Sequence, residues 1–116
     1  EEVVMVHGLG ANLGFWYLQI APMLSAYSRV TLFDLRGHGL SGMPKQGYTV
    51  ETLAADMRGL FDHLAIDSAH VIAHSFGGSV AARFACENER REGCKPSLCV
   101  GKRLRVRIVW NLDDRF

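Results

Sequence analysis

The chain has 116 residues, of which 48% are hydrophobic and 22% charged, and its formal net charge is +1. This composition is typical of a folded globular protein and argues against disorder. No apolar run approaches the roughly 18 residues of a membrane-spanning helix, and the first residues do not form a signal peptide. The three cysteines make no disulfide framework, so we expect a protein of the reducing cytoplasm with no membrane partner.

Charge divides the chain into two parts. Residues 1–89 carry 5 basic and 9 acidic side chains, whereas residues 90–116 carry 8 basic and 3 acidic ones. All five histidines lie in the first part, and the second is rich in arginine and cysteine. We therefore predict a folded unit over 1–89 and a basic tail over 90–116. The tail has two explanations: a truncated or frame-shifted reading of a longer gene, or a divergent genuine ending.

Residues 1–34 are predicted to contain two strands and a helix. Residues 3–6 form a β-branched apolar run that leads into a glycine loop, which is typical of a strand buried on both faces of a parallel sheet. A helix is predicted over 15–24, where Pro22 bends or shortens it. A second strand is predicted over 29–33, ending at Asp34.

The following segments continue this alternation. Glycines and a proline mark a long loop over 34–48, and apolar residues recur at helical spacing over 50–64, with Thr49 at the N-cap. A third strand is predicted over 69–73 and another helix over 79–86. Strands that alternate with helices predict βαβ units, a parallel sheet and the α/β fold class.

Ser75 is the candidate nucleophile. A serine hydroxyl reacts poorly unless it is held out beside a base, and a sharp strand-to-helix turn that does this tolerates only small residues nearby. Ala73 lies two residues before Ser75 and Gly77 two residues after it, where a predicted strand gives way to a helix. The alternative is a serine that caps the helix and has no chemical role.

Three motifs together resemble the α/β-hydrolase fold family. They are HGLG at 7–10, DLRGHGLS at 34–41 and AHSFG at 73–77, each at the end of a predicted strand and in the family's order. Ala73 stands where the family more often has glycine. The resemblance covers residues 3 to 89 and implies the N-terminal βαβαβα part of a parallel-sheet α/β-hydrolase fold, which is incomplete here.

The resemblance also implies roles for individual residues. An acyl-transfer enzyme needs two N–H groups directed at the developing oxyanion, and these would be the backbone amides of Leu9 and Phe76. Asp34 and Arg36 would serve as scaffold beneath the site. His7 would brace the oxyanion loop instead of acting as the base. The further residues that would support the loop and the nucleophile elbow are Gly8, Ala73, His74 and Gly77.

The glycine loop also fits a second class of protein. Gly8, Gly10 and Gly14 follow a strand and Asp34 closes the next one, as in a dinucleotide-binding fold. The glycine spacing is the less usual form, and that interpretation gives Ser75 no role. We therefore favour the hydrolase.

The catalytic acid and histidine of this family follow the nucleophile, yet no histidine follows Ser75 in this chain. Alternating residues over 104–110 are compatible with a half-exposed strand, and we expect the strand at 69–73 to be left as an exposed edge. The histidines and cysteines lack metal-site spacing, so we expect no metal and no cofactor.

We therefore expect a parent enzyme that hydrolyses an ester, a lactone or a related carbonyl substrate through an acyl-enzyme on Ser75. Its partner would be a small ester-like molecule and not a nucleic acid; the oligomeric state is left open. A serine argues against relatives that use aspartate at this position, such as dehalogenases and epoxide hydrolases. Carbon–carbon bond hydrolases, thioesterases and peroxidase-like members are left open. The alternative from another class is a non-catalytic fragment or pseudo-enzyme.

Overall fold

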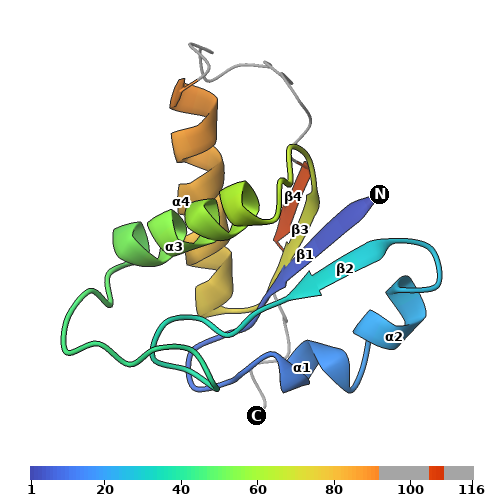
Figure 1. Cartoon of the computed structure of the whole chain (residues 1–116), viewed down its shortest axis with the longest axis horizontal. Helices are drawn as coiled ribbons and strands as arrows, with labels where there is room; N and C mark the ends of the chain where they lie inside the picture. Colours follow the sequence, from blue (N-terminus) through green and yellow to red (C-terminus); the bar gives the residue numbers. More distant parts are fainter. Residues whose placement is uncertain (92–104, 109–116) are drawn as a thin grey trace.

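Parallel strands form the centre of the structure, a computed structural model that describes residues 1–91 and 105–108 (Figure 1). The strands β1 (Glu2–Val6), β2 (Arg29–Leu32), β3 (His70–Ala73) and β4 (Arg105–Ile108) lie in the order β2-β1-β3-β4. The three strands predicted in the first part of the chain are confirmed, each to within one residue at either end. Because β1 has a neighbour on both sides, its carboxyl end lies at the middle of the sheet edge.

Helices cover both faces of this sheet. The helices α3 (Val50–His63) and α4 (Phe76–Arg91) pack on one face, and the short helices α1 (Gly14–Tyr17) and α2 (Ala21–Leu24) lie on the other (Figure 1). This arrangement confirms the predicted α/β class with a parallel sheet.

The alternation of side chains along β1 explains the two layers. Val4 and Val6 belong to the core beneath α3 and α4, whereas Val3 and Met5 pack with Trp16 on the face of α1 and α2. Successive residues of a strand point to opposite faces. A continuous apolar run is therefore what a strand covered on both faces requires.

The predicted helix over 15–24 was wrong in one respect, because the structure divides it into α1 and α2. Pro22 lies in the first turn of α2. In an unbroken helix it would lack the N–H that bonds to Leu18 and its ring would clash with the Leu18 carbonyl. Placing the proline at a helix start removes both problems, since an N–H there has no intrahelical acceptor.

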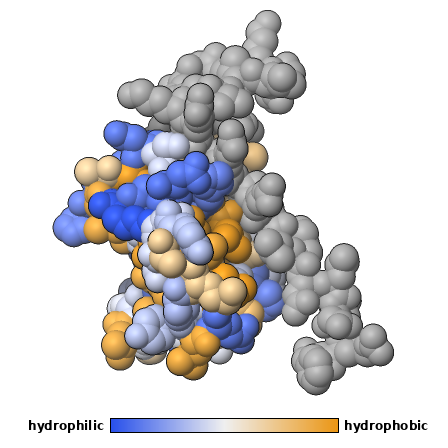
Figure 2. All heavy atoms as spheres, turned by 90° about the vertical axis from the view of Figure 1, so that its right-hand side faces the viewer, coloured by the Kyte–Doolittle hydropathy of each residue, from blue (hydrophilic) through white to orange (hydrophobic). Residues whose placement is uncertain are grey.

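The layer of α1 and α2 leaves large apolar side chains on the surface. Figure 2 shows apolar residues at the lower edge of the molecule, at the height that these helices occupy in Figure 1. Within the described residues, the exposed large apolar side chains of this layer are Tyr17, Leu18, Ile20, Met23 and Tyr27. The opposite layer, by contrast, buries Met57, Phe61 and Phe84 almost completely.

The helix at 50–64 was predicted closely. α3 ends at His63 with Leu64 as its C-cap, and the Thr49 hydroxyl accepts a hydrogen bond from the Thr52 N–H at 3.2 Å, as the predicted N-cap requires. The helix predicted over 79–86 is longer in the structure, because α4 begins directly after Ser75 and continues to Arg91. The predicted boundary at residue 89 falls inside α4 and stays a prediction.

The expectation that β3 would be an exposed edge was wrong. β4 pairs with β3 in parallel, from His70 opposite Arg105 to Ala73 opposite Ile108. This segment lies within the stretch whose alternating pattern is compatible with a strand. Residues 92–104 and 109–116 of the tail lie outside the described part of the chain. Among the described residues, no helix has the length and apolar character to cross a membrane.

Candidate active site

Ser75 lies where β3 turns into α4, and its backbone has an unusual conformation. Its φ is +52°, a region that glycine adopts freely but that costs other residues about 1–2 kcal/mol. The helix begins at the next residue, so the direction of the chain changes from strand to helix within a single turn. The Ser75 residue is exposed. A nucleophile elbow has this same strained strand-to-helix geometry.

The turn at Ser75 lies against the end of β1. The His74 N–H donates to the Val6 carbonyl at 3.0 Å, which extends the pairing of the two strands by one bond. A Cβ atom on Gly77 would collide with the carbonyl oxygens of Val6 and His7. Only glycine at 77 lets the first turn of α4 come this close to the β1 backbone.

The HGLG loop contacts the elbow from the other side. A Cβ atom on Gly8 would lie 3.2 Å from the Ser75 Cβ and 3.0 Å from the His74 Nδ1. Ala73, which replaces the more usual glycine, is completely buried. The structure therefore brings the predicted loop and the predicted elbow together, with Gly8 beside Ser75.

Two backbone N–H groups flank this contact. Leu9 follows Gly8, and Phe76 is the first residue of α4, where helical N–H groups have no acceptor within the helix. Within the described parts of the chain, neither the Leu9 nor the Phe76 amide donates to a protein acceptor. Both stay predicted members of an oxyanion hole.

His7 is completely buried beneath the loop with both ring nitrogens engaged. Its Nε2 accepts from the Leu35 N–H at 2.9 Å, so the proton lies on Nδ1, which donates to the Gly8 carbonyl at 2.8 Å. Desolvation by burial lowers the pKa of His7 below its ordinary value. The ring is therefore neutral, fixed in one tautomer and occupied by the fold, so it has no free nitrogen to act as a base.

Asp34 connects the N-cap residue of α1, Leu13, to the DLRGHGLS loop. Its Oδ1 accepts from the Leu13 N–H at 2.7 Å and its Oδ2 from the Leu40 N–H at 3.0 Å. Burial disfavours the charged carboxylate, but the two backbone hydrogen bonds outweigh this effect and lower the Asp34 pKa. Because the Asp34 side chain is only 6% exposed and both of its oxygens accept from the backbone, it offers little access to a ribose, which the dinucleotide alternative needs.

Arg36 anchors the DLRGHGLS loop to α3. Its Nε and Nη2 donate to the two carboxylate oxygens of Asp56, each at 2.7 Å. This bidentate hydrogen bonding raises the pKa of Arg36. Asp56 was not singled out from the sequence, because helical spacing places it only on the polar face of α3.

His38 is a site residue to which sequence reasoning gave no role. Its Nε2 accepts from the Gly10 N–H at 3.1 Å, and its Nδ1 lies 3.0 Å from the Arg36 carbonyl. The rings of His38 and His7 are adjacent, with centroids 5.1 Å apart. Because 28 residues separate His38 from Gly10, no local pattern in the sequence could have paired them.

His74 lies between the loop and α1. Its ring stacks on Phe15 with centroids 4.7 Å apart, and its Nδ1 is a buried atom with no hydrogen-bond partner among the described residues. His63 is exposed on α3, and His70 pairs with Glu1 at 3.4 Å. In the part of the chain that the structure describes, no group of three or more ligating side chains could hold a metal ion.

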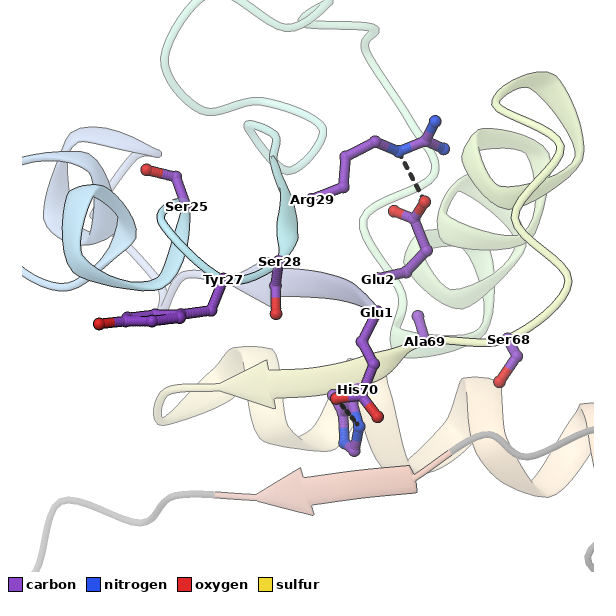
Figure 3. Close-up of a pocket in the computed structure, with 9 residues that line it drawn as sticks. All are labelled: Glu1, Glu2, Ser25, Tyr27, Ser28, Arg29, Ser68, Ala69 and His70. Carbon is purple, nitrogen blue, oxygen red and sulfur yellow. Dashed lines mark ion pairs between the residues drawn. The ribbon is translucent and has the colours of Figure 1, made fainter.

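A hollow of about 590 Å³ lies at the opposite end of the sheet (Figure 3). It is lined by residues at the start of the strands, where Arg29 pairs with Glu2 at 2.6 Å and His70 with Glu1. Ser75 follows the carboxyl end of β3, so this hollow is separate from the candidate active site. In open parallel sheets the carboxyl edge is where ligands bind.

Comparison with known proteins identifies the family of this chain. A family model for the alpha/beta hydrolase fold matches residues 2–100, so the chain belongs to the α/β-hydrolase fold family.

Its relatives include proteins with different activities. The dihydrolipoyllysine-residue acetyltransferase component of the acetoin cleaving system of Cupriavidus necator is 38% identical over 78% of the chain and 24% of its own length. The soluble epoxide hydrolase of Corynebacterium sp. strain C12 is 40% identical over 74% and 30%. The solved structure of a marine microorganism esterase matches with a TM-score of 0.78 and 26% identity over 93% of the chain and 36% of the esterase. The chain therefore spans between 24% and 36% of these proteins.

The contact at Gly77 predicts a large difference between two glycine substitutions in helices. Gly59→Ala on α3 meets no atom within 4 Å and should raise the free energy of unfolding by about 0.5–1 kcal/mol, because alanine favours helix. Gly77→Ala gains the same helix propensity, but its Cβ would be forced against two carbonyl groups. It should therefore lower the free energy of unfolding by about 1–3 kcal/mol. Urea denaturation measures both. Equal effects of the two substitutions would show that the backbone contact is absent.

The buried neutral His7 predicts that stability declines in mild acid. Its pKa in the unfolded chain is near the ordinary 6.5, and its folded pKa is lower. As the pH falls from 6.5 toward the folded pKa, the unfolded state takes up a proton that the folded state does not, so His7's contribution to stability is complete above 6.5 and is lost below it. Urea midpoints at about pH 7.5 and about pH 5 should differ less in His7→Gln than in the matched control His63→Gln. The same pH dependence in both variants would contradict this assignment.

Proposed function

We propose that this segment carries the nucleophile and the oxyanion donors of a hydrolase that acts on an ester, a lactone or a related carbonyl substrate. The observation that carries the proposal is Ser75, exposed at a positive-φ turn between β3 and α4. The Gly8 contact supports it, because Gly8 lies against Ser75 and Leu9 is the next residue of the loop. The names of relatives that are epoxide hydrolases or esterases support hydrolysis in general terms.

The proposed chemistry follows from what a serine oxygen can do. The Ser75 hydroxyl attacks the carbonyl carbon and loses its proton to a base, and the resulting oxyanion receives hydrogen bonds from Leu9 and Phe76. When this intermediate collapses, the bond between the carbonyl carbon and the leaving oxygen breaks, the leaving oxygen takes the proton back from the base and departs as an alcohol, and an acyl-enzyme ester on Ser75 is left. Water then attacks that ester, releases the acid and returns the proton to Ser75.

A serine nucleophile also indicates which relatives are the better guide to the substrate class. Attack of a serine oxygen on an epoxide carbon would form an ether, which water does not cleave readily. Attack on a carbonyl forms an ester, which can be hydrolysed in a second step. Ser75 therefore favours a carbonyl substrate, although one relative of this chain is an epoxide hydrolase.

A second candidate is that the 116-residue polypeptide is itself non-catalytic. The ring nitrogens of His7 and His38 are engaged by the fold, and no histidine follows Ser75 in the sequence. His74 precedes the serine, but its Nδ1 lies against Gly8. The base and the acid would then have to come from outside this segment.

The role of Ser75 can be tested in a completed enzyme, which we define as residues 1–88 joined to the C-terminal part of the marine microorganism esterase. A fluorophosphonate probe should label Ser75, and Ser75→Ala should abolish labelling and lower ester hydrolysis by at least about 1,000-fold. Ser79→Ala, an exposed serine on the same helix, is the matched control and should change neither. Turnover that survives Ser75→Ala would show that the nucleophile is another residue.

The 116-residue chain alone should show no serine-dependent turnover. Without a base the Ser75 hydroxyl stays protonated, and catalysis of acyl transfer falls by several orders of magnitude. Hydrolysis of p-nitrophenyl acetate should therefore be the same for the chain and for its Ser75→Ala variant. A rate above that of the variant would mean that one of the five histidines serves as the base.

A further inference from the structure

The Leu9 N–H belongs to the peptide group that joins Gly8 to Leu9. A peptide group is planar, and in its trans form the C=O and the N–H point in opposite directions. The described residues contain no cis peptide bond. A hydrogen bond that fixes the Gly8 carbonyl therefore fixes the Leu9 N–H as well, which points the opposite way.

Within the described residues, the Gly8 carbonyl accepts two hydrogen bonds of different kinds. The Ala11 N–H donates to it at 3.2 Å, which closes a turn inside the loop itself. The His7 Nδ1 donates to it at 2.8 Å from a completely buried ring. The first bond moves with the turn, whereas the second connects the turn to a ring that is fixed in the core. His7 is thus the side chain that determines how this peptide is oriented.

The His7 ring is held by a distant part of the backbone. Its Nε2 accepts from the Leu35 N–H at 2.9 Å, and both residues are buried. A neutral imidazole has one donor and one acceptor nitrogen, so acceptance at Nε2 places the proton on Nδ1, where the Gly8 carbonyl needs it. One side chain therefore connects the direction of the Leu9 N–H to the segment that follows β2.

Glycine at position 8 explains why this peptide needs an external contact. A Cβ there would lie 3.2 Å from the Ser75 Cβ, closer than ordinary van der Waals contact, so the approach to Ser75 favours glycine. Glycine also has the widest choice of backbone angles. The Phe76 amide differs, because the Gly78 N–H donates to the Ser75 carbonyl at 2.8 Å and fixes the Ser75–Phe76 peptide within the start of the helix. Of the two proposed donors, only Leu9 depends on a side chain.

We propose that His7 is a positioning residue of the active site: its Nδ1–H holds the Gly8 carbonyl and so sets the direction of the Leu9 N–H. This rests on the proposed function, in which that N–H is an oxyanion donor. It goes beyond bracing of the loop, because it assigns the effect to one ring nitrogen and one peptide. Oxyanion donors act through fixed geometry, and small displacements lower the rate strongly. His7 does not touch the substrate in this role.

Two substitutions separate the two ring nitrogens of His7. His7→Asn keeps an N–H donor as many bonds from Cβ as Nδ1 is, and removes the acceptor for Leu35. His7→Gln keeps an acceptor as many bonds from Cβ as Nε2 is, and removes the donor to Gly8. His7→Asn leaves the buried Leu35 N–H without an acceptor and should have the lower urea midpoint. Stability therefore ranks the glutamine variant above the asparagine variant, and the proposal ranks them in the reverse order for the geometry and rate of the site.

NMR spectroscopy of the ¹⁵N-labelled 116-residue chain tests the geometry without any need for activity. We expect a His7 ring protonated at Nδ1 and not at Nε2, and a Leu9 N–H order parameter of about 0.85, as for rigid backbone. A ring protonated at Nε2, or a Leu9 order parameter below about 0.6, would overturn the proposal in the unsubstituted chain alone.

Residual dipolar couplings of weakly aligned samples report the direction of each N–H bond. Scaled to the couplings of α3, the Leu9 coupling should keep its value in His7→Asn and change in His7→Gln. The Phe76 coupling should keep its value in both variants, because its peptide is fixed locally. A Leu9 coupling that is unchanged in His7→Gln would contradict the assignment.

Kinetics of the completed enzyme test the consequence. His7→Gln should lower kcat about tenfold with KM within about twofold, because the oxyanion forms only in the reaction, and His7→Asn should keep kcat to within about threefold. A merely structural role would give the larger loss in the less stable His7→Asn. His63→Gln and His63→Asn, at an exposed position of α3, are the matched controls and should change neither constant.

The failure of this proposal can be told from the failure of the proposed function. Equal kcat in the two His7 variants, or a lower kcat in His7→Asn, would refute the positioning role while leaving Ser75 labelling intact. Absence of labelling in the unsubstituted completed enzyme would instead overturn the proposed function, and the role of His7 with it, whatever the NMR result.

Discussion

The close contact between the first turn of α4 and the carboxyl end of β1 determines the rest of the site. The Val6 carbonyl accepts from the His74 N–H, and Gly77 lies against the carbonyl groups of Val6 and His7. No side chain fits in this contact, so the chain has to leave β3 and enter α4 between Ala73 and Gly77. The positive φ of Ser75 is the conformation that makes so short a connection. The exposed hydroxyl is thus a consequence of backbone packing.

The second constraint is that two loops 28 residues apart are joined by polar side chains and not by apolar packing. His7 and His38 accept from backbone amides, and Asp34 accepts from two more. Of these N–H groups, the one of Leu35 is buried, and leaving it without an acceptor would cost about 1–3 kcal/mol. The N–H groups of Gly10 and Leu40 are exposed, so their hydrogen bonds contribute direction more than stability. Together these hydrogen bonds hold the two loops in one geometry. This rigidity is what stabilisation of an oxyanion requires.

Much of the fold could be predicted from local patterns, because buried strands and amphipathic helices leave a signal of fixed period. The strand at 3–6 and the helix at 50–64 are examples, and so is the capping by Thr49. The division into α1 and α2 was missed because Pro22 was expected to bend or shorten a single helix, whereas it begins a separate one. The pairing of β4 with β3 could not be predicted, since it depends on contacts across more than thirty residues of sequence.

For the site, the sequence indicated which residues lie at strand ends but not which atoms meet. Ser75, Gly8 and Gly77 could be proposed because a sharp turn restricts residue size. The acceptor roles of His38 and Asp56 could not, because hydrogen bonds between distant loops leave no periodic trace. His7 was expected to brace the loop, but only its two contacts show that its tautomer is fixed.

The backbone at residue 75 makes the serine there informative about natural selection. At a φ of +52° glycine or asparagine would have less backbone strain than serine. The fold alone therefore gives no reason to keep a hydroxymethyl group at this position. A lineage that had lost the chemistry would be free to drift toward glycine and would gain stability by doing so. The residue found at this turn among descendants of the chain would therefore record whether their chemistry was still being selected.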